Sequence, residues 1–258
     1  MRSALLLVTC LLATVPAGAQ FVAPGGVIPV VANLPGLNDT FWRSDVSILN
    51  VTAESTQVVL QLYPEIQGGV PAFEPIITDA ISVPPDAQLT LTNVVQSRFQ
   101  LTNVKGALWV VSLDGTPLVI TSRTFTVDGT GGSYGQDVTS VLVADTAWAG
   151  GLRHDGFFRT NLGIFWPWDL TPGETVRFDV SVRDETGSEV GAGSVTFGEA
   201  GLQQVSLGSF GVQTLIDGYA LITCSDPAAV WYGYASRVDQ ITGDAVYRPA
   251  RGYQSALP

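Results

Sequence analysis

The sequence predicts an all-β protein made of two tandem antiparallel β-sandwich units, Ig-like or jelly-roll-like, related by internal duplication. Charged residues make up only 14% of the chain and glycine and proline are frequent, a composition that favours strands and turns over helices. Short runs of alternating apolar and polar residues recur between turn signals, as in all-β folds. A ten-residue pattern over 41–50 also returns over 157–166, at an offset of 157 − 41 = 116 residues.

Residues 1–19 have the layout of a cleaved secretory signal peptide. A short positive region is followed by an apolar run over 4–15 and by the small residues Ala17, Gly18 and Ala19. The apolar run is about 12 residues long, whereas a membrane span needs roughly 20. We therefore expect cleavage before Gln20, a secreted or periplasmic location, and no membrane insertion of the mature protein.

The first β-sandwich unit is expected to cover residues 20–138. Residues 28–32 contain Pro29 and are expected to form an edge strand, where proline is tolerated. Alternating and turn-bounded segments predict further strands, over 41–50, 56–63, 80–83, 88–91, 106–111 and 118–125. One helical turn is expected over 94–99, and Asp114-Gly115 is a strong turn signal between the expected strands over 106–111 and 118–125.

The second β-sandwich unit is expected to cover residues 139–250, with a C-terminal tail over 251–258. Its expected strands follow the order of the first unit, over 157–166, 176–182, 195–197 and 204–207, and near 220 and 236. Asp184-Glu185-Thr186-Gly187 predicts a hairpin turn, and the Gly-rich segment 129–135 is interpreted as a linker. Matching positions recur at nearly one offset, as in 195 − 81 = 114 and 220 − 107 = 113, which indicates duplication.

The repeated pattern identifies candidate structural residues. The residues that recur in register are Phe41, Arg43 and Asp45 in the first unit and Phe157, Arg159 and Asn161 in the second. Alternate side chains of a strand share a face, so the faces that carry Ile48 and Ile164 are expected to be core. Each arginine then lies on the opposite face, where we expect it to tie the strand to a neighbouring loop. A ligand-binding arginine is the alternative.

The start and the end of a unit carry a resemblance to a known group of proteins. The motif Phe-aromatic-Arg-[Ser/Thr]-[Asp/Asn], with Thr-Gly-Asp-Ala-Val-Tyr-Arg-Pro-Ala over 242–250, resembles tandem β modules in secreted proteins of environmental bacteria. The resemblance covers nearly the whole mature chain. It implies export and a β fold, and it implies no activity, cofactor or site residue.

Charge and cysteine content exclude several function classes. The formal net charge is −11 and Lys105 is the only lysine, so the chain has no basic patch to neutralise phosphates and nucleic-acid binding is not expected. Cys224 is the only cysteine after residue 19. It cannot form an internal disulfide, and we expect it to be a small buried residue.

His154, the only histidine, lies in a Gly-rich loop, and we expect a surface or structural role rather than membership of a catalytic triad. One histidine and one cysteine also cannot supply the usual ligands of zinc. The carboxylates that could pair for glycoside hydrolysis are Asp184, Glu185, Asp239 and Asp244. Calcium binding by acidic loops is a further alternative, because Ca²⁺ binds several oxygen ligands. The residues that could bind it are Asp128, Asp137, Asp239 and Asp244. No other cofactor is expected.

Aromatic residues are the best hint of a binding site. The candidates are Trp166, Trp168, Trp231 and Tyr232. An exposed aromatic row could stack on sugars or bind a partner, whereas the alternative is that these rings are core residues. We therefore expect a non-enzymatic interaction or structural module that meets a protein or polysaccharide surface. A carbohydrate-binding module is the alternative, and an acid-pair glycosidase is the third hypothesis.

Overall fold

A computed structural model describes residues 23–36, 39–66, 74–127 and 131–252. The protein is all-β, and every pairing between its strands is antiparallel, as the sequence predicts. The expected signal peptide over 1–19 and the calcium candidate Asp128 lie outside the described residues.

The first half of the chain forms one nine-stranded sheet in the order β4-β3-β7-β1-β2-β8-β9, with β5 beside β3 and β6 beside β2. Its strands are β1 (Gly25–Pro35), β2 (Phe41–Asn50), β3 (Thr56–Pro64), β4 (Ile76–Ile77), β5 (Ile81–Val83), β6 (Gln88–Leu91), β7 (Val104–Ser112), β8 (Leu118–Val127) and β9 (Ser133–Asp137). The helical turn α1 (Val94–Phe99) lies where the sequence predicts it. Ile48 of β2 and Leu60 of β3 belong to the same buried cluster, which lies against this sheet.

The second half is a sandwich of two five-stranded sheets, β10-β17-β12-β15 with β18 beside β17, and β14-β13-β16-β11-β19. Its strands are β10 (Leu142–Ala144), β11 (Thr146–His154), β12 (Phe158–Trp166), β13 (Val176–Asp184), β14 (Glu189–Phe197), β15 (Gly201–Ser206), β16 (Leu215–Cys224), β17 (Val230–Asp239), β18 (Ala245–Pro249) and β19 (Arg251–Gly252). A short 3-10 helix, η1 (Leu207–Phe210), follows β15. The turn predicted at 184–187 does close the β13–β14 hairpin.

Four expectations about individual segments are wrong. β1 is no edge strand, because it pairs with both β2 and β7, and a register shift between Ile28 and Val31 accommodates Pro29. The turn at Asp114 does not join neighbouring strands, because β7 and β8 have different partners. Part of the expected linker forms β9, and the first two residues of the expected tail form β19.

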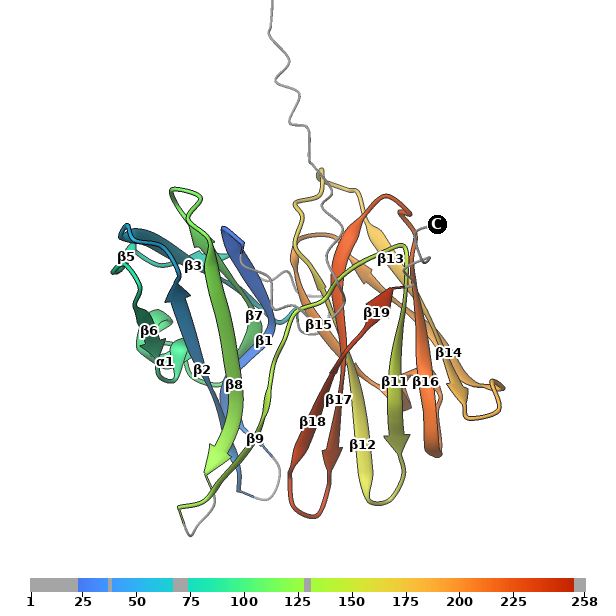
Figure 1. Cartoon of the computed structure of the whole chain (residues 1–258). Coiled ribbons are helices and arrows are strands. Elements are labelled where there is room, and N and C mark those ends of the chain that lie inside the picture. The colour runs from blue at the N-terminus through green and yellow to red at the C-terminus, as the bar shows by residue number, and fades with distance from the viewer. Residues whose placement is uncertain (1–22, 37–38, 67–73, 128–130, 253–258) are drawn as a thin grey trace, which may run out of the picture.

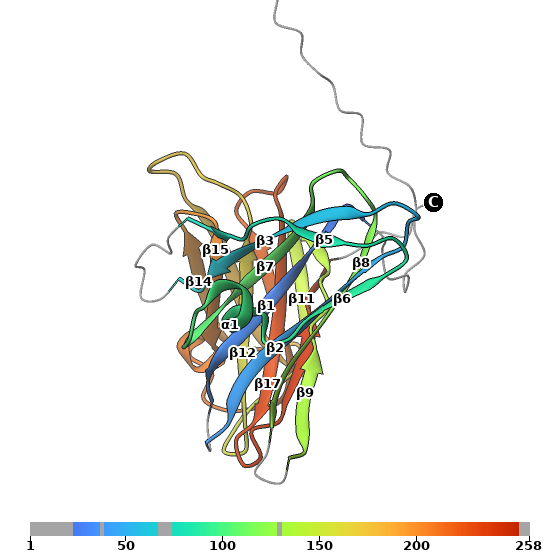
Figure 2. The same cartoon turned by 90° about the vertical axis from the view of Figure 1, so that its left-hand side faces the viewer.

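The sheet that contains β12 is buried on both faces. Leu162, Ile164 and Trp166 point into the core of the second-half sandwich. Phe165 points the other way and joins the core cluster of the first half, where its ring meets that of Tyr63 edge-on at 5.1 Å. The two halves are therefore packed against each other (Figure 1), and Figure 2 views the stack from the side of the first half.

Polar contacts also join the two halves. The Lys105 ammonium forms an ion pair with Glu65 at 2.9 Å and donates a hydrogen bond to Gln204 of β15. The backbone N–H of Ile66 donates to the carbonyl of Leu202 at 2.8 Å. In the part of the chain that the structure describes, no helix has the length and apolar character needed to cross a membrane.

Candidate functional site

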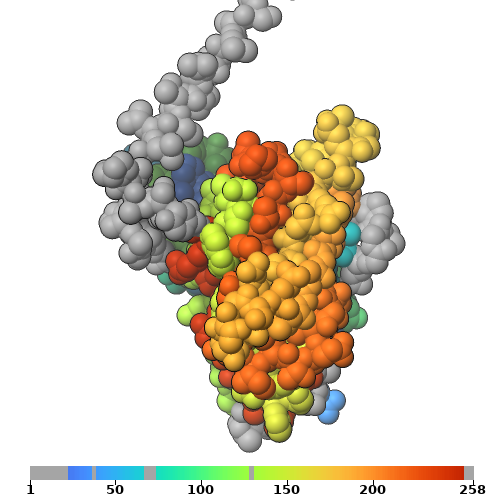
Figure 3. All heavy atoms as spheres, turned by 90° about the vertical axis from the view of Figure 1, so that its right-hand side faces the viewer, coloured from blue at the N-terminus to red at the C-terminus, as the bar shows by residue number. Residues whose placement is uncertain are grey.

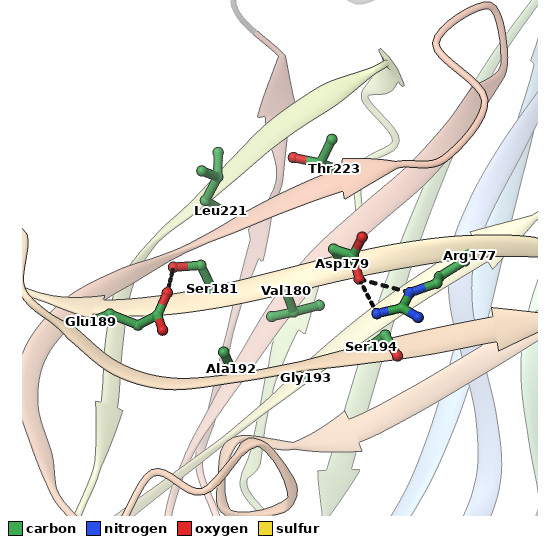
Figure 4. Close-up of a pocket in the computed structure, with 10 residues that line it drawn as sticks. All are labelled: Arg177, Asp179, Val180, Ser181, Glu189, Ala192, Gly193, Ser194, Leu221 and Thr223. Atoms are coloured by element: carbon green, nitrogen blue, oxygen red, sulfur yellow. Dashed lines mark hydrogen bonds and ion pairs between the residues drawn. The ribbon is translucent and has the colours of Figure 1, made fainter.

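A hollow of about 480 Å³ lies on the outer face of the β14-β13-β16 sheet. That volume falls in the usual range for ligand pockets. The residues that line it are Arg177, Asp179, Val180, Ser181, Glu189, Ala192, Gly193, Ser194, Leu221 and Thr223 (Figure 4). Figure 3 shows the side of the molecule on which this outer sheet of the second half lies.

The alternation of β13 creates the polar lining of this hollow. Phe178 and Val180 are buried in the sandwich core, and the intervening Arg177, Asp179 and Ser181 point outward because successive side chains alternate between faces. The next strand contributes only short side chains at this level, from Ala192, Gly193 and Ser194. The hollow exists because long side chains on β13 stand beside very short ones on β14.

The charged groups of the hollow are already paired with one another. The Arg177 guanidinium lies 2.7 Å from Asp179, and the two side chains are 59% and 61% exposed. Ser181 donates a hydrogen bond to Glu189 at 2.7 Å. An exposed ion pair of this kind contributes only about 0–1 kcal/mol. These groups can therefore exchange partners with a polar ligand at little cost.

Sequence reasoning did not identify this hollow. The run Gly191-Ala192-Gly193-Ser194 is the signal that could have found it, because small residues in a strand leave space on its surface. That signal has meaning only once the register places Ala192 opposite Ser181 and Ser194 opposite Asp179.

Two of the four candidate ligand-binding aromatics lie in the core. Trp166 is 4% exposed and Trp231 is fully buried, and both rings contact Phe178, at 6.2 and 5.0 Å. Their suggested role in stacking on a ligand is wrong for this structure, because neither ring reaches the surface. Both tryptophans are core residues of the second-half sandwich.

The other two aromatics lie near the junction of the halves. Trp168 is 41% exposed, its indole N–H donates to the carbonyl of Val230 at 2.6 Å, and its ring meets Trp109 edge-on at 6.3 Å. Tyr232 is half-buried and stacks on Phe165 at 6.0 Å. Burial raises the pKa of the Tyr232 phenol. The four candidates do not form one exposed row.

The repeated motif residues have structural surroundings. Phe41 and Phe157 are 38% and 57% exposed. The Asp45 carboxylate accepts a hydrogen bond from the backbone N–H of Asn93 at 2.8 Å, which ties β2 to the start of α1. Asn161 is half-buried within β12. The faces that carry Ile48 and Ile164 are core, as predicted.

The two repeated arginines differ from the expectation. Among the described residues, neither guanidinium has a hydrogen-bond or ion-pair partner, and the Nε atoms of Arg43 and Arg159 are both buried. Arg43 instead lies over the ring of Phe125 at 5.8 Å. Burial lowers the pKa of Arg159. The expected hydrogen bond from each arginine to a neighbouring loop is therefore not formed.

The candidate catalytic acids occupy turns. The Asp184 carboxylate accepts hydrogen bonds from the side chain and backbone of Thr186, and these bonds lower the pKa of Asp184. The Asp239 carboxylate accepts hydrogen bonds from the backbone N–H groups of Thr242 and Ile241, and these bonds lower the pKa of Asp239. Glu185 and Asp244 are exposed in the same two turns.

The described residues contain no cluster that could hold a metal ion, and one ring nitrogen of His154 has no hydrogen-bond partner among them. Within the described ranges, no group of three His, Cys, Asp or Glu side chains, Asp137 included, is placed to hold a metal ion. His154 is half-buried at the end of β11, and its Nδ1 has no hydrogen-bond partner among the described residues.

Comparison with known proteins adds no further constraint. No protein-family model matches the chain, and no curated protein matches it significantly.

Proposed function

We propose that the protein is an exported, non-enzymatic interaction or structural module that presents the outer face of the β14-β13-β16 sheet to a partner. The observation that carries the proposal is the open hollow lined by paired polar groups on a rigid sheet. Binding there requires no cofactor. The expected signal over 1–19 supports a secreted or periplasmic location and release of the mature chain at Gln20.

We also propose that the two halves are related units produced by duplication, over 20–138 and 139–250. The motif strands have matching neighbours, because β2 pairs with β6 and β8 while β12 pairs with β15 and β17. Likewise β3 pairs with β5 and β7, and β13 pairs with β14 and β16. The repeated sequence pattern at matched places in the sheets supports a common origin.

Carbohydrate binding is the second candidate function. Trp148 is 39% exposed and pairs in register with Leu221, which lines the hollow. An aromatic ring on the same sheet as hydroxyl, carboxylate and guanidinium groups suits a sugar, which offers both an apolar face and hydroxyl groups.

A binding array tests these proposals. The mature protein, residues 20–258, is applied to an array of glycans, bacterial surface polymers and peptides. We expect binding to at least one class of probe, and Asp179→Ala should weaken it by about tenfold, the effect of losing a charge-assisted hydrogen bond. Asp217→Ala, at an exposed position of β16 outside the hollow, should bind as the parent does. Absence of binding to every probe, or equal binding by both variants, would refute the proposal.

A further inference from the structure

The outer edge of β14 is open to another strand. β14 pairs with β13 on one side, and no described strand pairs with its other side. It is nine residues long. The other described strands with a single neighbour are β4, β5, β6, β9, β10, β15, β18 and β19, which range from two to six residues. β14 is thus the longest free edge in the described part of the chain (Figure 1).

Hydrogen bonds fix the direction of the free backbone groups. The backbone N–H of Arg177 donates to Ser225 Oγ at 3.0 Å, and its carbonyl accepts from the Ser225 N–H at 2.7 Å. Both groups of Arg177 therefore point away from β14. Thr196, which is opposite Arg177 in the register, consequently directs its own groups to the free side, where its carbonyl accepts from Gln203 Nε2 at 2.8 Å.

The same direction follows for the next alternate residues of β14. Backbone groups of an antiparallel strand point alternately to its two sides, so Ala192 and Ser194 share the outward direction of Thr196. Both are exposed, as is Gly193 between them. No hydrogen bond among the described residues occupies the outward N–H and C=O groups of Ala192 and Ser194. A strand that paired with these groups would lie at the usual spacing of about 4.8 Å.

β14 lacks two common protections of an edge strand, lysine and proline, and its register shift is confined to the end that contains Glu189 and Gly191. Proteins blunt exposed edges with lysine, proline or very short strands. β18 ends at Pro249, and β5 is three residues long and is followed by Pro84. The sequence of β14, Glu-Val-Gly-Ala-Gly-Ser-Val-Thr-Phe, contains neither lysine nor proline.

The negative charge around β14 determines which kind of strand can pair with its free edge. The chain carries a net charge of −11, Glu189 and Glu199 flank the free segment, and Arg177 is already paired with Asp179. A second copy of the chain would bring the same negative charge to the edge, so an uncharged or basic strand is the better complement.

We infer that β14 recruits an extended, uncharged or basic segment of another protein, which adds a strand to the sheet by hydrogen bonding to Ala192 and Ser194. Strand addition obtains affinity from main-chain hydrogen bonds and specificity from alternate side chains, which here extend over the hollow beside β14. This inference rests on the proposed function, because it names the partner of the same face.

Amide hydrogen exchange followed by NMR tests the inference directly. The probe is the acetylated and amidated peptide Lys-Thr-Val-Thr-Val-Thr-Val-Lys, at about 1 mM, a concentration that saturates sites of micromolar affinity. We expect exchange at Ala192 and Ser194 to slow by about tenfold or more, because a new strand protects those amides. Gly193 and Val195 already donate to β13 and should change little. This alternation distinguishes strand addition from binding over the sheet face.

Two variants, one on the free edge and one away from it, sharpen the test. Ala192→Pro removes the outward N–H without removing a hydrogen bond to β13 and should weaken peptide binding by about tenfold. Asp217→Ala, at an exposed position of β16 outside the hollow, leaves every outward group of β14 in place and should bind the peptide as the parent does. The exchange pattern of the parent protein decides the question even if Ala192→Pro folds poorly.

Three outcomes would overturn the inference. No protection of Ala192 and Ser194 by the peptide excludes strand addition at this edge. Protection that rises with protein concentration in the absence of peptide assigns the edge to a second copy of the chain. Binding of the peptide away from Ala192 and Ser194 refutes this inference and leaves the proposed function intact. The same holds if a glycan binds in the array while the peptide leaves these two amides unprotected, whereas failure of both the array and the peptide refutes both.

Discussion

Replacing Phe165 by alanine should uncouple the two halves of the protein. Phe165 is fully buried, and its ring contacts Tyr63 of the first half and Tyr232 of the second. Removing a buried phenylalanine costs about 3–5 kcal/mol, and the melting temperature of a protein this size falls by about 2–4 °C per kcal/mol. We therefore expect a decrease of about 6–20 °C.

Differential scanning calorimetry measures the loss, and a matched variant locates it. Phe178→Ala removes an equally buried ring from the core of the second half, and it should destabilise that half without loosening the junction. The parent is expected to unfold in a single transition. Phe165→Ala should instead give two transitions, because it removes a ring that joins the second half to the core cluster of the first. A single transition within about 2 °C of the parent, a shift equivalent to less than about 1 kcal/mol, would show that the junction does not couple the halves.

Three further predictions concern individual side chains. Hydrogen bonds from Thr56 and other neighbours hold the pKa of Asp114 well below its ordinary value, so its stabilising effect is full above about pH 4 and is lost as the pH falls further. Asp114→Asn should accordingly be less stable than the parent at pH 7 in urea unfolding, with a difference that shrinks below pH 4. Arg43→Ala should cost about 0.5–1 kcal/mol through its lost contact with a ring. Arg159→Met should be neutral or stabilising, because it removes a half-buried charge whose Nε atom has no hydrogen-bond partner among the described residues. A larger loss for Arg159→Met than for Arg43→Ala in the same assay would contradict this. Burial raises the pKa of the Cys224 thiol, so iodoacetamide should react with this thiol far more slowly in the native than in the unfolded protein. Neither chelators nor reductants should lower the melting temperature of the protein.

Local pattern was enough to predict much of the secondary structure. The alternation of β2 predicted that Ile48 faces a core, and the turn residues at 184–187 predicted a hairpin that the structure contains. The helical turn at 94–99 was also predicted. Each of these features depends on residues close together in the sequence.

Features that depend on contacts distant in sequence were not predicted. The alternation of β12 suggested one buried face, but Phe165 on the opposite face is also buried because the first half covers it. Trp166 and Trp231 were candidates for ligand binding with the core as the alternative, and both lie in the core of the second-half sandwich. A single sequence did not decide between the two, because it does not reveal which strands stack. The hollow could not be predicted either, because it requires the register that sets Ala192 beside Ser181.

The shared junction has a consequence for how the molecule can be divided. Phe165, Leu202 and Tyr234 belong to the second half by sequence, yet their side chains complete the core cluster of the first. A fragment consisting of either half alone would leave these three side chains, or the surface that they cover, in contact with water. Such apolar patches promote aggregation. Deletion or domain-exchange experiments that cut between 138 and 139 should therefore yield insoluble fragments, and the two halves are best handled and engineered as one body.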